Sequence, residues 1–442
     1  MQESTTLKQL LAEPQSVEEL NIPQSIVIDL ILKLLFNEGN VALSRFIEVL
    51  KISSRIIDTI LLWMQKEHLV EVTKAGSELG RLGYVYTQTE AGQLRARDAL
   101  ERSQYIGPVP VSINDYQRGI ELQTKQKRSV SAELVKHALN HLVLPESFHR
   151  MIGPAINSGS SLFLYGPPGN GKTTIAETIG KLISGTDPIW LPYVLSAGGY
   201  IIQIHDRLVH KPVAHETKRN TELGRIDQRW GLFNRPSVMV GGELKMEALD
   251  LRYDQVGKFY EAPLQLKANG GMFLIDDFGR QQIRPGDLLN RWIVPLEDEV
   301  DFLRLHSGQT IVIPFRMLIV FSTNLDPMEL VDDAFLRRIQ MKVEVASPDE
   351  KIYYQIFVNE CKSFNVPFDR NSFLHLLHSW YRQENRALQA VHPRDLIRTV
   401  VSLCEYDKVT PQLSPSLIDD ACHLYFVSKT QNKIPKLMET SA

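Results

Sequence analysis

The chain has 442 residues, of which 43% are hydrophobic and 23% are charged. This is the composition of a globular protein, and it excludes a chain that is disordered throughout. The 49 lysines and arginines against 52 aspartates and glutamates give a formal net charge of −3, which argues against a surface built as a whole to bind polyanions. The three cysteines form no Cys-x-x-Cys pair, which argues against a disulfide scaffold or a cysteine-ligated zinc site and suits a reducing compartment.

The N-terminal segment shows no targeting signal. Residues 1–15 lack the basic start and the apolar stretch of a signal peptide. The longest apolar run near this end, residues 27–36, is interrupted by Asp29 and Lys33, and it is far shorter than the ~20 apolar residues that span a bilayer. We therefore expect a cytoplasmic protein without a membrane span.

Residues 22–104 are predicted to form a small α+β domain. Apolar residues recur at helical spacing in three segments, 26–36, 43–50 and 55–67. Two strand-like runs follow at 69–72 and 84–87 and predict a hairpin, and a last helix is predicted at 90–102. Three helices followed by a hairpin resemble a winged-helix domain, which is a variant of the helix-turn-helix.

The rest of the chain divides into three regions. Residues 105–129 contain Gly107-Pro108-Val109-Pro110 and few apolar positions, which is typical of a linker. Predicted strands and helices alternate from 130 to 346, so we expect an α/β core with a mostly parallel sheet. Residues 347–430 show helical spacing alone and are predicted to form a helical lid. The predicted fold class is therefore α/β, with the α+β domain in front of it.

The strongest functional signal is a Gly-rich loop that fits the pattern G-x-x-x-x-G-K-[ST] in full. Its residues are Gly166, Pro167, Pro168, Gly169, Asn170, Gly171, Lys172 and Thr173. An apolar strand-like run, 162–165, leads into the loop, and a predicted helix starts at Thr174. The glycines let backbone N–H groups turn toward a triphosphate, and the helix N-terminus favours negative charge. The chain is therefore predicted to bind a nucleoside triphosphate, which we take to be ATP.

The same loop and a second predicted strand supply candidate ligands for Mg²⁺. Lys172 would reach the β- and γ-phosphates, and the Thr173 hydroxyl would bind the ion. Residues 271–277 predict a buried strand that ends in two carboxylates, the Walker B arrangement. Asp276 would hold Mg²⁺ through water, and Asp277 would orient or deprotonate the attacking water.

More polar residues follow at the ends of later predicted elements. The predicted strand 317–321 ends in Ser322-Thr323-Asn324, so Asn324 is placed to contact the γ-phosphate or the attacking water. Arg337 and Arg338 lie at the end of a predicted helix, and Arg394 lies near the start of a lid helix.

In this order and at these spacings, the loop, the acidic strand, the asparagine and the arginines resemble the AAA+ ATPase family over roughly residues 130–430. The resemblance implies ATP and Mg²⁺ as cofactors. It makes Asn324 similar to sensor 1 and Arg394 similar to sensor 2. It also implies that Arg337 or Arg338 is the arginine finger that a neighbouring subunit inserts, within a homo-oligomeric ring that is commonly a hexamer.

A subclass is indicated by residues 301–313, which predict a hairpin that turns at Ser307-Gly308. A hairpin at this place is similar to the pre-sensor-1 insertion of MoxR-type and enhancer-binding ATPases. Upstream of the acidic strand stand Tyr253, Phe259 and Tyr260. These rings either line a loop that faces the centre of the ring and grip a polymer, or they pack inside the fold.

Three functions are compatible with these features. The first is a chaperone-like ATPase that remodels a protein client. The second is a DNA-associated regulator or loader that uses residues 22–104. Residues 1–105 carry 11 basic and 14 acidic side chains, and the predicted recognition helix 53–67 is neutral, which favours protein over DNA as the partner. The third is an ATP-dependent scaffold with little hydrolysis, because Asp277 stands where the family usually has the longer Glu.

Overall fold

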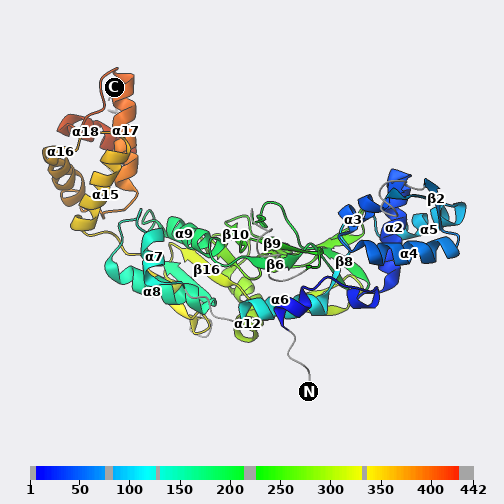
Figure 1. The fold of residues 1–442 in the computed structure, drawn as a ribbon. Coiled ribbons are helices and arrows are strands. Elements are labelled where there is room, and N and C mark those ends of the chain that lie inside the picture. Colours follow the sequence, from blue (N-terminus) through cyan, green and yellow to red (C-terminus); the bar gives the residue numbers. More distant parts are fainter. Residues whose placement is uncertain (1–5, 75–82, 126–129, 214–224, 331–335, 428–442) are drawn as a thin grey trace, which may run out of the picture.

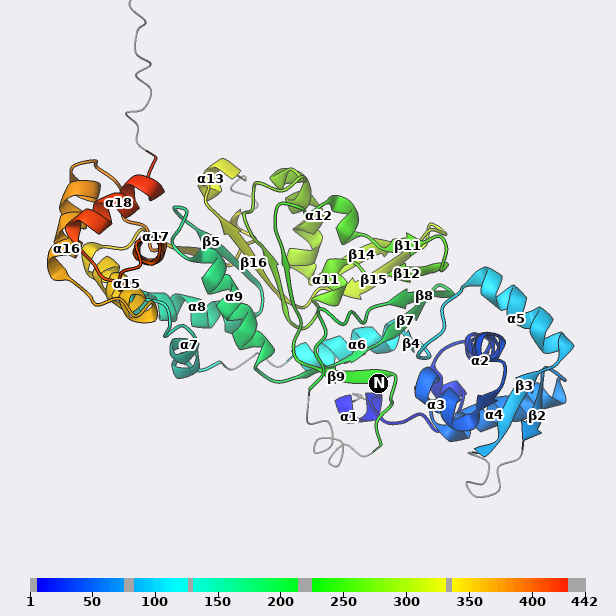
Figure 2. The same cartoon turned by 90° about the horizontal axis from the view of Figure 1, so that it is seen from above.

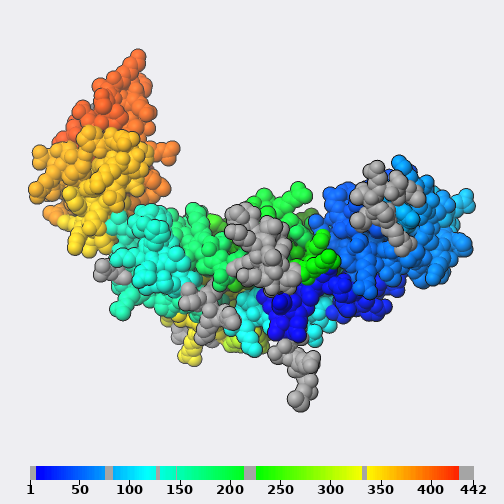
Figure 3. All heavy atoms as spheres, viewed as in Figure 1, coloured from blue at the N-terminus to red at the C-terminus, as the bar shows by residue number. Residues whose placement is uncertain are grey.

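The computed structural model describes residues 6–74, 83–125, 130–213, 225–330 and 336–427. Four bodies follow one another along an elongated molecule (Figures 1 and 2). We call them the N-terminal domain, the β module, the sheet domain and the helical domain, the last of which stands out at one end in the space-filling view (Figure 3).

The N-terminal domain packs four helices against a three-stranded antiparallel sheet of order β1-β3-β2. Its elements are α2 (Gln24–Glu38), β1 (Val41–Ala42), α3 (Leu43–Leu50), α4 (Ser54–Lys66), β2 (Val70–Lys74), β3 (Val85–Gln88) and α5 (Glu90–Arg102). Ser53 and Thr89 begin α4 and α5, because their hydroxyls accept hydrogen bonds from backbone N–H groups of the first turn. The helices and the hairpin predicted in this region are therefore confirmed.

The β module is built on a mixed sheet of order β11-β12-β8-β7-β4. Its strands are β4 (Val111–Ser112), β6 (Ile189–Pro192), β7 (Val194–Ala197), β8 (Tyr200–Gln203), β9 (Trp230–Phe233), β11 (Arg252–Asp254), β12 (Phe259–Glu261), β14 (Val300–Arg304) and β15 (Thr310–Pro314). Helices complete it: α1 (Leu7–Leu10), α6 (Ile113–Thr124) and α11 (Leu264–Lys267). Leu20 of η1 (Glu18–Leu20) is instead buried in the core of the N-terminal domain, and Leu249 of η3 (Met246–Leu249) in that of the sheet domain. Much of the region predicted as an α/β core thus forms a separate β-rich unit.

The prediction of a linker at residues 105–129 is wrong. Within its described part, β4 pairs in parallel with β7, and α6 packs against β6 and β15. Tyr116 and Ile120 of α6 are fully buried in the core of the β module. The glycine and prolines near the start of the segment dominated the prediction and hid the apolar positions that follow at helical spacing.

The predicted hairpin at 301–313 is confirmed. β14 and β15 pair antiparallel, and Gly308 in the turn has φ +86°, a conformation that glycine adopts without steric cost. Asp301 of β14 is fully buried and pairs with Arg291 of α12 (Pro285–Asp298). This ion pair anchors the hairpin to the helix that follows the acidic strand.

The upstream aromatic rings pack inside the fold. Tyr260 is 1% exposed, and its hydroxyl accepts a hydrogen bond from the backbone N–H of His306. The ring of Tyr253 stacks on that of His306 with an interplanar angle of 6°. Phe259 meets Tyr105 edge to face, with 5.8 Å between ring centroids. Of the two interpretations of these rings, packing is therefore the one that the contacts bear out.

The sheet domain contains a five-stranded, all-parallel sheet of order β10-β13-β16-β5-β17. Its strands are β5 (Ser161–Tyr165), β10 (Ser237–Val240), β13 (Met272–Ile275), β16 (Leu318–Thr323) and β17 (Met341–Glu344). Helices α7 (Ala132–Ala138), α8 (Glu146–Ser158) and α9 (Lys172–Ser184) cover one face, and α12 covers the other. Successive side chains of β5 point to opposite faces, so Leu162 and Leu164 pack under α8 and α9 while Phe163 packs toward α12. The α/β fold class is thus confirmed.

The helical domain has a core of its own. It comprises α15 (Glu350–Ser363), α16 (Arg370–His375), the π-helix η4 (Leu376–Arg382), α17 (His392–Tyr406) and α18 (Pro415–Tyr425). All three cysteines of the chain, Cys361, Cys404 and Cys422, are buried in this core as free thiols. None of the helices in the described part of the chain has the length and apolar composition that crossing a bilayer requires.

The N-terminal domain and the β module share one hydrophobic cluster. Val194 of β7 and Ile201 of β8 are buried together with side chains of α2, α3 and α4. A buried ion pair reinforces this junction, with 2.7 Å between Arg229 Nη2 and Asp227 Oδ2. Arg229 Nη1 also donates to the backbone carbonyls of Leu20 and Pro110, each at 3.1 Å. One guanidinium therefore joins three separate stretches of chain.

We predict that Arg229→Met destabilises this junction by about 3–5 kcal/mol, because it leaves the Asp227 carboxylate buried without an opposite charge. The double variant Arg229→Met/Asp227→Leu removes both charges, so its free energy of unfolding should fall by clearly less than that of the single variant. Urea unfolding of the full chain measures both. A single variant as stable as the wild type, or no more damaging than the double, would contradict a structural role for the pair.

Candidate nucleotide-binding site

The Gly-rich loop lies between the end of β5 and the start of α9, as its sequence predicted. Gly166 has φ +133°, and a Cβ atom there would lie 2.5 Å from the carbonyl oxygen of Val345. Only glycine fits at this point, because a side chain would collide with the backbone that follows β17. The loop is thus held against the neighbouring strand's end, with its backbone turned toward α9.

Lys172, the first residue of α9, turns back over the loop. Its Nζ donates to the carbonyl oxygens of Gly166 at 2.8 Å and Pro167 at 2.7 Å. Burial lowers the pKa of Lys172, and the carboxylates of Asp276 and Asp277 oppose that effect. A partly desolvated ammonium group gains from an anion beside it, which is what a phosphate would supply.

Thr173 and Asp276 meet at the carboxyl ends of β5 and β13. The Thr173 hydroxyl donates to Asp276 Oδ2 at 2.8 Å. Octahedral Mg²⁺ with oxygens at ~2.1 Å has neighbouring ligands about 3 Å apart. The two oxygens are close enough for Thr173 to bind a Mg²⁺ ion and for Asp276 to hold it through water, and oxygen donors are the ones this ion prefers.

Asp277 and Asn324 meet next to this pair. Asn324 Nδ2 donates to Asp277 Oδ1 at 3.2 Å. Asp277 has φ +49°, a left-handed conformation that aspartate tolerates better than most residues. A second bond fixes the two strand ends, because Thr323 Oγ1 donates to the carbonyl oxygen of Phe278 at 2.7 Å. A carboxylate acceptor and a carboxamide are thus held side by side, as orienting a water molecule requires.

A cavity of about 490 Å³ opens between the sheet domain and the helical domain at this point. Its walls include the loop and helix start from Gly169 to Ile175, together with Asp277, Ser322, Asn324 and Arg394. Gly166, Pro167, Pro168 and Asp276 lie outside the lining, at the base of the loop and behind Thr173. Arg394 is 58% exposed and pairs with Asp395 of its own helix.

Part of the cavity was not predicted from the sequence. The segment 141–144 between α7 and α8 lines it, as do Ile356, Asn359 and Glu360 of α15. Burial raises the pKa of Glu360, and Arg394 acts in the opposite direction. No motif marks these positions, and the one available signal was the short apolar run Leu142-Val143-Leu144.

The structure does not bring Arg337 or Arg338 into this cavity. Arg337 is exposed, and Arg338 Nε donates to Glu297 Oε1 of α12 at 2.7 Å. Arg338 is thus engaged within its own chain. The role of arginine finger stays a prediction for both residues.

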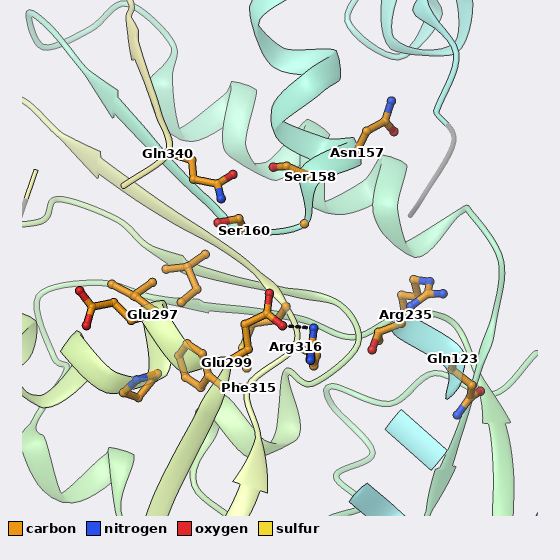
Figure 4. Close-up of a pocket in the computed structure, with 16 residues that line it drawn as sticks. Gln123, Asn157, Ser158, Ser160, Arg235, Glu297, Glu299, Phe315, Arg316 and Gln340 are labelled. Carbon is orange, nitrogen blue, oxygen red and sulfur yellow. Dashed lines mark ion pairs between the residues drawn. The ribbon is translucent and has the colours of Figure 1, made fainter. Parts of the chain in front are cut away.

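A second cavity, of about 180 Å³, lies at the opposite edge of the parallel sheet (Figure 4). Ser158 and Ser160 precede β5 and Gln340 precedes β17, which places it at the amino ends of these strands. The ion pair of Arg316 with Glu299 stands in its wall. The described residues that line it include none of the Gly-rich loop, so it is separate from the candidate site.

Comparisons with known proteins give one family match and several distant likenesses. Residues 349–424, nearly all of the helical domain, match a family described as "Domain of unknown function (DUF8689)". The chain is 22% identical over 232 residues to a vesicle-fusing ATPase from Dictyostelium discoideum, a match that spans 51% of this chain and 24% of that protein. The chain thus matches about a quarter of that relative's length.

Two solved structures show weak similarity. NtrX from Brucella abortus aligns with 12% identity and a TM-score of 0.37, over 70% of this chain and 58% of its own. A mutant of RuvB from Thermotoga maritima aligns with 14% identity and a TM-score of 0.34, over 67% and 71%. TM-scores this low do not support a statement about the fold, which is defined by the strand pairings described above.

We predict that Lys172→Ala lowers ATP affinity by about 100-fold or more, because it removes the ammonium group that would pair with the phosphates. Lys181→Ala is the matched control, since Lys181 is an exposed lysine in the last turn of the same helix. A nucleotide titration with each variant measures the effect. Equal affinity of the Lys172→Ala protein and the wild type would refute the site.

Proposed function

We propose that the chain is a Mg²⁺-dependent AAA+ ATPase that works as a homo-oligomeric ring and remodels a protein client. The observation that carries the proposal is that Asp277 and Asn324 meet at the cavity beside Lys172, where Thr173 pairs with Asp276 behind it. Loop, metal ligands and a carboxylate for water are the three parts that phosphoryl transfer to water needs.

Each residue has a separate task in this proposal. The loop backbone and Lys172 bind the β- and γ-phosphates, and Thr173 with Asp276 holds Mg²⁺. The bound ion would offset the negative charge of the phosphates. Asp277 accepts a hydrogen bond from the attacking water and then its proton, while the Asn324 carboxamide fixes that water's orientation. Arg394 approaches the γ-phosphate from the helical domain, which would let hydrolysis change the placement of that domain.

The client would be engaged at the other end of the molecule. We infer that the N-terminal domain is winged-helix-like and serves as a docking unit, since it presents helices and a hairpin on a scaffold that shares its core with the β module. Its excess of acidic over basic residues favours protein over nucleic acid as its partner.

A DNA-associated regulator or loader is the second candidate, and one observation favours it. Four exposed residues of α4, Arg55, Thr59, Leu62 and Lys66, follow each other at helical spacing, so two positive charges share one exposed face, beside the half-buried Asp58. Fluorescence anisotropy with duplex DNA at low and high salt distinguishes the candidates. Salt-sensitive binding below micromolar concentrations would favour DNA over a protein client.

Hydrolysis itself is tested by steady-state phosphate release. We predict measurable turnover for the wild type, a fall of at least about 100-fold for Asp277→Asn, and a rise for Asp277→Glu if the shorter side chain limits the reaction. Asp287→Asn is the control, because Asp287 is an exposed aspartate in the first turn of α12. ATP binding without turnover in the wild type would instead favour the scaffold function.

We predict that Arg337→Ala lowers turnover by about 1000-fold without affecting assembly, as expected for a finger that stabilises charge in the transition state. Arg338→Ala should have a smaller effect, similar to that of Glu297→Gln, because both break the same ion pair. Phosphate release and sizing of the oligomer measure the two properties. Full turnover by an assembled Arg337→Ala protein would exclude it as the finger.

A further inference from the structure

The Gly-rich loop is hydrogen-bonded directly to the segment that leads into α17. The backbone N–H of Val391 donates to the carbonyl oxygen of Gly169 at 2.9 Å. The backbone N–H of Ala390 donates to the side-chain Oδ1 of Asn170 at 3.1 Å. Asn170 Nδ2 in turn points to Ser347 Oγ, at 3.4 Å. The Asn170 carboxamide therefore touches both the segment after β17 and the segment before α17.

The loop pattern does not call for this side chain. Asn170 occupies one of the four positions at which G-x-x-x-x-G-K-[ST] accepts any residue. The residue is nevertheless only 5% exposed. A buried carboxamide is costly unless its donors and acceptor are paired, and here it is hydrogen-bonded to Ser347 and Ala390, which lie outside the loop.

The contact between the two segments is tight. Gly169 has φ +74°, and a Cβ atom there would lie 2.8 Å from both Gln389 Oε1 and Val391 Cγ1. The tip of the loop and residues 389–391 are thus packed without space for a side chain between them. Helix α17 begins one residue later, at His392, and Arg394 stands in its first turn.

We propose that Asn170 is a positioning residue that latches the start of α17 to the Gly-rich loop and so sets where Arg394 stands in the cavity. The inference rests on the proposed function in so far as it concerns turnover. Arg394 makes its ion pair with Asp395 of its own helix, so its position relative to the loop follows from where α17 begins. A change at the phosphates would then reach the helical domain through this carboxamide and through the Val391–Gly169 backbone hydrogen bond beside it.

The latch itself is tested without nucleotide, by amide hydrogen exchange of the full chain. Asn170→Ala should speed exchange of the Ala390 amide by about five-fold, the effect of losing one hydrogen bond of ordinary strength. Asn371→Ala is the matched control, because Asn371 is an exposed asparagine of the helical domain. Unchanged exchange at residue 390 in a folded Asn170→Ala protein would overturn the latch.

The effect on Arg394 is tested by turnover. Asn170→Ala should lower kcat about ten-fold while the ATP dissociation constant changes less than about three-fold, because Lys172 and the loop backbone still bind the phosphates. Ser347→Ala should also lower kcat more than it changes the ATP dissociation constant, but by a smaller factor. Ser347→Thr keeps the hydroxyl and should have the kcat of the wild type. These two variants also decide the matter if Asn170→Ala does not fold.

The two ways of failing can be told apart. If the wild type neither binds nor hydrolyses ATP, the proposed function fails while the exchange experiment still decides the latch. If the wild type hydrolyses ATP and the Asn170 and Ser347 variants keep its kcat, the positioning role fails and the ATPase stands. Parallel loss of affinity and kcat in Asn170→Ala would mean that the side chain serves the phosphates directly, which also overturns the proposal.

Discussion

The hydrogen bond from the Thr173 hydroxyl to the Asp276 carboxylate joins residues that lie 103 positions apart in the chain. It can form because β5, β13 and β16 run in the same direction, so their carboxyl ends reach one edge of the sheet. The same constraint brings Asn324 to Asp277. Every polar group of the candidate site that comes from the sheet domain depends on this shared edge, and a change of register in any of the three strands would separate the pairs.

The candidate site could be predicted from local patterns because each of its parts is a strand end followed by a special residue. The loop from Gly166 to Thr173 fits its pattern in full, and Asp276 and Asn324 follow apolar runs that are buried on both faces of the sheet. Such runs are typical of parallel strands. The sequence did not show whether the loop, Asp276 and Asn324 lie close together, because a sequence motif gives no distance in space between separate segments.

Apart from the hairpin of β14 and β15, the β module escaped prediction for physical reasons. Its strands have five residues or fewer, and β4, β7, β8 and β12 come from three distant parts of the chain. Short strands whose partners are far away in the sequence leave no periodicity to detect. Arg229, the guanidinium that joins this module to the N-terminal domain, looks in the sequence like any surface arginine, because its burial is a property of the fold. The same holds for Asn170 in the loop.

The junctions between the domains differ in the kind of contact that forms them. The N-terminal domain shares a hydrophobic cluster with the β module, whereas the core of the helical domain draws only on residues between 353 and 426. The helical domain meets the Gly-rich loop instead through hydrogen bonds, at Gly169 and Asn170. Hydrogen bonds of about 1 kcal/mol each are broken far more easily than a buried apolar core. Motion that starts at a bound nucleotide would therefore appear first between the sheet domain and the helical domain, which is where the cavity lies and where Arg394 enters it.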